Sequence, residues 1–176
     1  MKDRFSTCLP FILRHEGGFS NHPNDPGGAT YKGITLSTYK KAFGSDKTVE
    51  DLKQISIGEL NKIYEVFYWE AANCVGLPRG IDLCLFDMAV NAGPSRAQKL
   101  LQEALHVKQD GKIGPITRSE AHRRDLLQTV DDYAEIRMRY YHSLKHKSDF
   151  IAGWMQRVSN TCKDAKTMIQ SPYIIY

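Results

Sequence analysis

Helical periodicity dominates the hydrophobic pattern of this chain, and the alternation that is typical of strands is nearly absent. The strongest pattern follows Ser56 and Glu59, which have the spacing of a capping box. Apolar residues then recur on one helical face: Leu60, Ile63, Tyr64, Phe67 and Tyr68. Similar faces predict helices over 81–92, 94–105, about 118–145 and 153–168, with a shorter helix over 35–43 that Gly44 ends. The pattern therefore predicts a mainly α fold.

Turn-forming residues interrupt this pattern. The loop from Glu16 to Gly33 is rich in Gly and Pro, and any strand in the chain should belong to a short hairpin flanking it. Gly93 is placed to end one helix and Pro94 to begin the next, so two helices meet at a sharp corner. No linker of convincing length occurs, and we expect one compact domain over 1–176. A seam near 76–80 would divide it into lobes at 1–78 and 79–176.

The composition narrows the class of protein. At 176 residues and 41% hydrophobic content the chain can bury a real core. A net charge of +4 is weak for a dedicated nucleic-acid binder but suits contact with an anionic polymer. The cysteines are scattered without a CxxC pair, which favours small core residues in a reducing compartment over metal ligands. They are Cys8, Cys74, Cys84 and Cys162.

The only apolar run near the start covers 9–13 and is followed at once by charged residues. It is too short for a signal peptide or a membrane span. We therefore expect a protein without an export route of its own.

Glu16 and Asp25 are candidates for paired acid and base chemistry. Hydrolysis of a glycosidic bond needs one protonated carboxyl near neutral pH and usually a second, ionised one. Apolar residues around Glu16 would raise its pKa by desolvation, while Asp25 in its polar loop would stay ionised. Thr30 follows, where its hydroxyl can orient a water. On spacing alone, a solvent-facing Glu at a helix end and an Asp in a turn explain the same residues.

Metal chemistry is not expected here. His15 and Glu16 resemble the start of a zinc-protease helix, but position 19 is Phe instead of the second His. The loop at 21–30 lacks the alternating acids and the closing Glu of a calcium-binding EF-hand. We therefore expect no metal and no cofactor.

Two segments resemble one known family. The segments 16–18 (Glu-Gly-Gly) and 25–35 (Asp-Pro-Gly-Gly-Ala-Thr-Tyr-Lys-Gly-Ile-Thr) closely resemble the signature of glycoside hydrolase family 108. This family contains N-acetylmuramidases found among phage endolysins. The segments 86–94 and 110–117 look like the family's second half, often described as a predicted peptidoglycan-binding domain. The resemblance covers nearly the whole chain.

The resemblance implies a lysozyme-like helical fold, α+β at most, with a small hairpin next to the catalytic cleft. It implies that Glu16 is the general acid. By analogy with phage-type lysozymes, Asp25 would stabilise charge or act as base, and Thr30 would hold the water for an inverting reaction. Those enzymes have eight and then five residues between the three positions. Here the intervals are eight and four, so the conformation of the hairpin decides whether Asp25 and Thr30 reach the cleft.

Other positions are secondary candidates. Tyr31 would offer a ring face to a sugar, and Asn91 would either bind an N-acetyl group or cap its helix. A buried structural hydrogen bond explains Asp87 better than substrate contact. Trp154 and Arg157 resemble a family feature, but their spacing also suits packing with a charged tip at the surface, and no catalytic role is assigned to them.

The resemblance implies cleavage of the β-1,4 bond between N-acetylmuramic acid and N-acetylglucosamine. A lytic transglycosylase and a non-catalytic peptidoglycan-binding or scaffold module stay open as alternatives. As an endolysin, a monomer would wait in the producing bacterium's cytoplasm until a holin-like protein gives access to the wall. Basic residues gather in the C-terminal half, either as solvated helix faces or to steer the protein toward the anionic wall. They include Arg118, Arg123, Arg124, Arg137 and Arg139.

Overall fold

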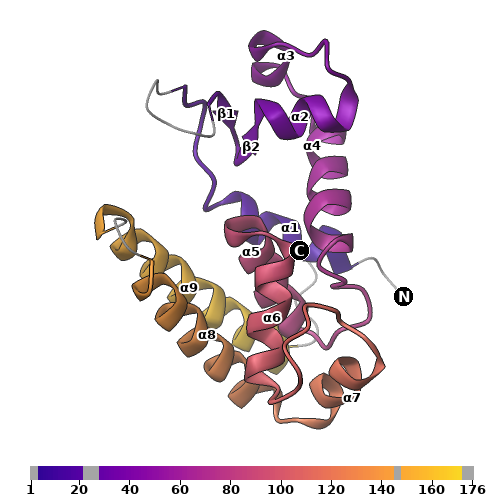
Figure 1. The fold of residues 1–176 in the computed structure, drawn as a ribbon, viewed down its shortest axis with the longest axis vertical. Coiled ribbons are helices and arrows are strands. Elements are labelled where there is room, and N and C mark those ends of the chain that lie inside the picture. The colour runs from indigo at the N-terminus through magenta and orange to yellow at the C-terminus, as the bar shows by residue number, and fades with distance from the viewer. Residues whose placement is uncertain (1–3, 22–27, 145–147, 172–176) are drawn as a thin grey trace.

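The computed structural model describes residues 4–21, 28–144 and 148–171. This part of the chain is mainly helical and contains one two-stranded hairpin (Figure 1), which confirms the predicted fold class. The elements are α1 (Arg4–Leu13), β1 (Thr30–Tyr31), β2 (Ile34–Thr35), α2 (Leu36–Phe43), α3 (Val49–Lys53), α4 (Ile57–Tyr64), η1 (Glu65–Glu70), α5 (Ile81–Ala92), α6 (Pro94–Ala104), α7 (Pro115–Arg123), α8 (Leu126–His142) and α9 (Ser148–Gln170).

Helix α5 is the centre of the fold. Every residue from Ile81 to Ala89 is buried, and α1, α6, α8, α9 and η1 all contact this helix (Figure 1). The ring of Phe86 packs against Phe5 of α1 and Trp69 of η1, with centroids 5.8 and 5.3 Å apart. Because both ends of the chain pack on α5, this helix sets how the N-terminal and C-terminal segments meet.

Side-chain caps explain where three of the helices begin. The hydroxyl of Thr35 accepts a hydrogen bond from the backbone of Thr38 at the start of α2. Ser56 and Glu59 form the predicted capping box of α4. Thr48 and Asp51 form a second capping box and start the short helix α3, which the apolar pattern did not predict. A capping box supplies partners for the first backbone N–H groups, so even a five-residue helix can form.

The helix predicted from Ser56 changes its geometry halfway. It ends as α4 at Tyr64 and continues as η1, a π-helical segment. A π-helix has a wider turn than an α-helix, so the residues that share a face change. Tyr64 and Trp69 are buried, whereas Phe67 and Tyr68 are half-buried.

The prediction of one helix over 118–145 is wrong. The structure has two helices, α7 and α8, separated at Arg124 and Asp125. Arg124 is extended, and the carboxylate of Asp125 accepts a hydrogen bond from the backbone N–H of Gln128 at 2.8 Å. An acid at an N-cap starts a new helix, and the regular apolar spacing begins only after it, at Leu126 and Leu127. The last helix, α9, extends beyond the predicted 153–168 at both ends.

The predicted corner and hairpin are confirmed. Gly93 has a φ of 86° between α5 and α6, and Pro94 is the first residue of α6. Strands β1 and β2 pair antiparallel, and an isolated bridge joins Ser20 to Thr30. The hairpin thus closes the glycine-rich loop and brings its end back toward α1.

Three of the cysteines, Cys8, Cys74 and Cys84, are buried as predicted, Cys162 is half-buried, and all four are free thiols. Among the described residues, no helix has the length and apolar character needed to cross a bilayer.

Candidate active site

Glu16 lies just beyond the end of α1. The helix ends at Leu13, and the backbone N–H of Glu16 donates to the carbonyl of Leu13 at 3.1 Å, which tightens the turn that follows the helix. Its side chain is 12% exposed. The Glu16 side chain is therefore held close to the core, with only a small part of it reaching solvent.

Arg157 of α9 connects Glu16 to the centre of the molecule. Its Nη1 lies 2.8 Å from Oε1 of Glu16, and its Nε lies 2.8 Å from Oδ1 of Asp87 on α5. The second oxygen of Asp87 accepts a hydrogen bond from Nη2 of Arg137 on α8 at 2.6 Å. Carboxyl and guanidinium groups alternate along this chain of contacts. Since Asp87 is fully buried, it holds Arg157 in a fixed orientation and, through Arg157, the carboxyl of Glu16.

The charges in this network stabilise one another. Burial opposes the charged form of Asp87, but Arg137 and Arg157 outweigh it and hold the pKa of this carboxyl below its usual value. Burial likewise opposes the charge on Arg157, yet Asp87 and Glu16 raise the pKa of its guanidinium above the usual value. Asp87 and Arg157 are therefore charged at neutral pH.

The hairpin turn packs beside the other oxygen of Glu16. Gly33 lies in the turn between β1 and β2 with a φ of 74°, and a Cβ atom there would fall 2.5 Å from Oε2 of Glu16. The same Cβ would fall 2.7 Å from the hydroxyl of Tyr64, which donates to the carbonyl of Lys32 at 2.7 Å. Lys32 also bonds through its backbone N–H to the carbonyl of Gly17 at 3.2 Å. Only glycine fits this close approach at a positive φ.

Three further side chains near Glu16 are neutral at neutral pH: Tyr64, Tyr68 and His15. Burial, together with the nearby Glu16, raises the pKa of Tyr64 well above its usual value and also raises that of Tyr68. Burial lowers the pKa of His15, and the nearby Arg157 adds to this effect although Asp87 opposes it. Nε2 of His15 is buried without a hydrogen-bond partner among the described residues.

Of the other predicted site residues, one lies outside the described part of the chain and two lie in the hairpin. Asp25 lies outside the described residues. Thr30 is in β1, in the hairpin that packs on Glu16, and its hydroxyl donates to the carbonyl of Gly28 at 3.2 Å. Tyr31 is half-buried with Nζ of Lys32 5.5 Å from its ring centroid.

Asn91 is half-buried in the last turn of α5, four residues after Asp87. That spacing places it on the same face of the helix as Asp87. Whether Asn91 caps the helix or contacts a substrate stays a prediction.

Reasoning from the sequence missed the contact between Arg157 and Glu16. It correctly gave Asp87 a structural role, and that residue was the available signal. A lone acid in an otherwise apolar helix must find a cationic partner when it is buried. The cation had to come from a basic residue on another helix, but the sequence contains too many basic residues to choose between them.

The basic residues of the C-terminal half are largely neutralised by local partners. Arg123 and Arg124 pair with Glu120, Arg139 pairs with Glu103, and Arg137 is buried against Asp87. These ion pairs favour the interpretation of these residues as solvated helix faces. They speak against a strongly positive surface. Steering toward an anionic wall stays a hypothesis, and a lytic rate that does not change with salt would remove it.

The segment at 110–117 is built around Gln102. Its amide nitrogen donates to Oδ1 of Asp110 at 2.7 Å and to the carbonyl of Lys112 at 3.0 Å, while its oxygen accepts from the backbone of Gly111 at 2.8 Å. Gly111 has a φ of 74°. The Asp-Gly turn of this segment is therefore fixed by one buried amide, which gives these residues a structural role.

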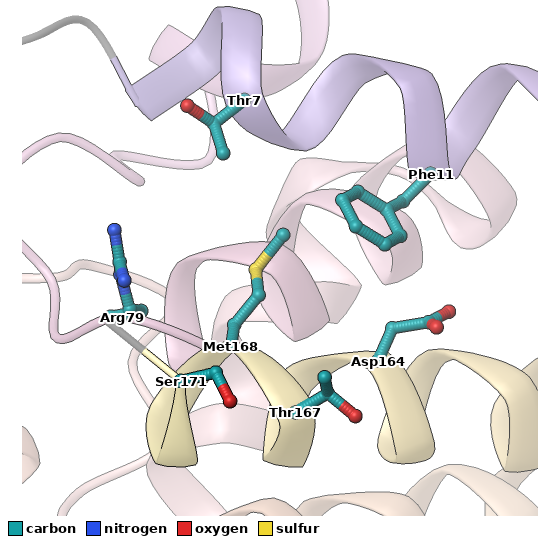
Figure 2. Close-up of a pocket in the computed structure, with 7 residues that line it drawn as sticks. All are labelled: Thr7, Phe11, Arg79, Asp164, Thr167, Met168 and Ser171. Atoms are coloured by element: carbon teal, nitrogen blue, oxygen red, sulfur yellow. The ribbon is translucent and has the colours of Figure 1, made fainter. Parts of the chain in front are cut away.

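A separate pocket lies between α1 and the C-terminal part of α9 (Figure 2). Its lining mixes apolar and charged side chains: Thr7, Phe11, Arg79, Asp164, Thr167, Met168 and Ser171. Asp164 also forms an ion pair with Arg14. Glu16 does not line this pocket. In the described part of the chain, no three or more His, Cys, Asp or Glu side chains are grouped to hold a metal ion.

Comparisons with known proteins identify the family of this chain. The family model described as Glycosyl hydrolase 108 matches residues 9–93, and the model described as Predicted Peptidoglycan domain matches residues 96–159. No curated protein matches the chain. The solved structure of Brucella abortus SagA is 33% identical, with a TM-score of 0.85 over 95% of this chain and 96% of that one. With both halves matched and a relative aligned over nearly its full length, the chain belongs to glycosyl hydrolase family 108 and is a peptidoglycan hydrolase.

Proposed function

We propose that this glycoside hydrolase is an N-acetylmuramidase that cleaves the β-1,4 bond between N-acetylmuramic acid and N-acetylglucosamine. The observation that carries the proposal is the fixed position of the Glu16 carboxyl. Arg157 holds one of its oxygens at 2.8 Å, and the hairpin backbone at Gly33 packs beside the other. A carboxyl oriented from both sides meets the geometric demand on a general acid.

In this mechanism Glu16 donates its proton to the leaving glycosidic oxygen. Asp25 stabilises the developing positive charge on the sugar or activates the attacking water, and Thr30 orients that water through its hydroxyl. The hydroxyl of Thr30 donates to the carbonyl of Gly28, so its oxygen lone pairs are available to accept a hydrogen bond from water. By analogy with phage-type lysozymes, the proposed outcome is inversion at the anomeric carbon.

Product analysis of purified peptidoglycan tests this proposal. Hydrolysis adds one water molecule and leaves a reducing sugar end, whereas a lytic transglycosylase forms an anhydro ring without added water. We expect reducing ends on N-acetylmuramic acid from the wild type. Anhydro products would favour the transglycosylase, and a wild type that clears no peptidoglycan would leave only a binding or scaffold role.

Single substitutions test the proposed roles of Glu16 and Asp25. Glu16→Gln keeps the shape of the side chain but cannot donate the proton, so turnover should be lost while binding to peptidoglycan is kept. Glu103→Gln is a matched control, because this acid pairs with Arg139 on the helical surface away from Glu16. A loss of activity in Asp25→Ala would argue against a transglycosylase, which needs only one carboxyl.

The biological role that we propose is that of a phage endolysin acting as a monomer. The protein would stay in the cytoplasm of the producing bacterium and reach the wall after a holin-like protein opens the membrane. The resemblance to endolysin muramidases supports this role. Expression in bacteria with and without a membrane-permeabilising protein tests it, and rapid lysis is expected only in the first case.

A further inference from the structure

A row of stacked aromatic rings joins α8 to α9. The ring of Tyr141 stacks on that of Trp154 with centroids 4.9 Å apart and planes 26° apart. Trp154 in turn stacks on Phe150, at 5.9 Å and 25°. Tyr141 is 2% exposed, whereas Phe150 is 62% exposed. The row therefore starts in the core and ends with a ring that faces solvent.

This row shares a helix face with the residue that holds Glu16. Phe150, Trp154 and Arg157 follow one another at i, i+4 and i+7 on α9, a spacing that places all three on one side of a helix. Seven residues of α-helix span about 10 Å. Phe150 thus lies about 10 Å along α9 from Arg157, the residue that contacts the Glu16 carboxyl, a separation comparable with the length of a disaccharide.

The position of Phe150 distinguishes it from an ordinary exposed apolar residue. Single apolar side chains on a surface are common and need no function. Here the exposed ring is supported by a second ring, and it belongs to the segment 96–159 that matches the peptidoglycan domain. Figure 1 shows the start of α9 on the same side of the molecule as the β1–β2 hairpin. A ring that is already ordered loses little conformational entropy when a ligand covers it.

We propose that Phe150, supported by Trp154 and Tyr141, is a subsite that stacks on a sugar ring of the peptidoglycan glycan strand. The proposal rests on the proposed function, since it places the scissile bond at Glu16. A pyranose ring presents a flat face of C–H groups, which packs on an aromatic face and removes apolar surface from water. The glycan strand fits this surface better than a stem peptide, whose amide groups need polar partners that an aromatic face does not provide.

Binding of glycan fragments of graded length tests the subsite. Calorimetric titration with disaccharide to octasaccharide fragments of peptidoglycan would compare the wild-type residue at position 150 with Phe150→Ala, Phe150→Trp and Phe150→Leu. Every protein in this titration, the wild-type reference included, carries Glu16→Gln, so that the fragments are bound without being cleaved. Loss of one aromatic contact should weaken binding of the long fragments about five- to tenfold, and binding of the disaccharide should not change. Phe150→Trp, which keeps an aromatic ring, should bind the long fragments as tightly as the wild type. Phe150→Leu, which keeps bulk without a ring, should bind them as weakly as Phe150→Ala.

Ile116→Ala is the matched control, because Ile116 is 74% exposed in the same domain but lies on α7. Its affinity should equal that of the wild type, and thermal melts should show that all variants fold. Equal affinities of wild type and Phe150→Ala for every fragment would overturn the subsite, as would a wild type that binds none of them. Product analysis with the wild type decides the hydrolytic function separately, so either proposal can fail while the other stands.

Discussion

Arg157 donates a hydrogen bond to the carboxyl of Glu16 at 2.8 Å, although 141 positions of chain separate the two residues. The contact joins the turn after α1 to α9 and links the segment matched by the hydrolase family to the segment matched by the peptidoglycan domain. The C-terminal part of the chain therefore contributes directly to the geometry of the proposed general acid.

Arg157→Lys should lower kcat by about a hundredfold, because a displacement of about 1 Å at a catalytic group has effects of this size. A lysine keeps the charge, but its single ammonium lacks the fork that contacts Glu16 and Asp87 together. The measurement is kcat and KM on purified peptidoglycan, with KM expected near the wild-type value. Arg139→Lys, at an exposed pair with Glu103, serves as the control. A kcat unchanged in Arg157→Lys would show that Arg157 does not position Glu16.

Asp87→Asn should destabilise the fold by about 3–5 kcal/mol, since removing one partner leaves the buried charge of Arg137 and Arg157 uncompensated. Urea denaturation measures the change. Glu135→Gln is the control, because this exposed acid lies 3.6 Å from Arg139 and a surface pair contributes at most about 1 kcal/mol. Equal losses in the two variants would contradict a stabilising role for the buried network.

Gly33→Ala should reduce both stability and activity. The added methyl group would lie 2.5 Å from Oε2 of Glu16 and 2.7 Å from the hydroxyl of Tyr64, which is closer than van der Waals contact. Alanine is also strained at a φ of 74°. Strain of this kind costs about 1–3 kcal/mol. Gly18→Ala is the control, because a Cβ there meets nothing within 4 Å. Thermal melts and turnover of both variants provide the comparison, and a Gly33→Ala protein as active as Gly18→Ala would rule out the close approach.

His15 should make the stability depend on pH in the weakly acidic range. Its pKa in the folded protein is below the ordinary value of 6.5, so the unfolded chain binds more protons as the pH falls past that value. The contribution of neutral His15 is therefore complete above about pH 7 and is lost as the pH falls toward the folded pKa. Free energies of unfolding at pH 8, 7, 6 and 5 should decline less in His15→Gln than in the wild type. A difference between the two proteins that does not vary with pH would refute this role for His15.

Local sequence signals predicted much of the fold. Ser56 with Glu59, Gly93 with Pro94 and Gly44 after a short apolar face marked helix ends correctly, because caps and breakers act over a few residues. The predicted helix over 118–145 ran through Asp125, an N-cap acid that starts α8 just before the apolar spacing begins at Leu126. The lobe boundary at 78 and the roles of Asp25 and Thr30 stay predictions.

The sequence by itself determined the helical class, the hairpin, the family resemblance and Glu16 as the candidate general acid. Motifs and periodicity are local properties, so they can be read without the tertiary structure. Only the tertiary structure decided which of many arginines reaches Glu16, and that Asp87 fixes it from inside the core. The physical reason is that a buried carboxylate must pair with a cation, but the packing of α5 against α8 and α9 decides which cation lies within reach.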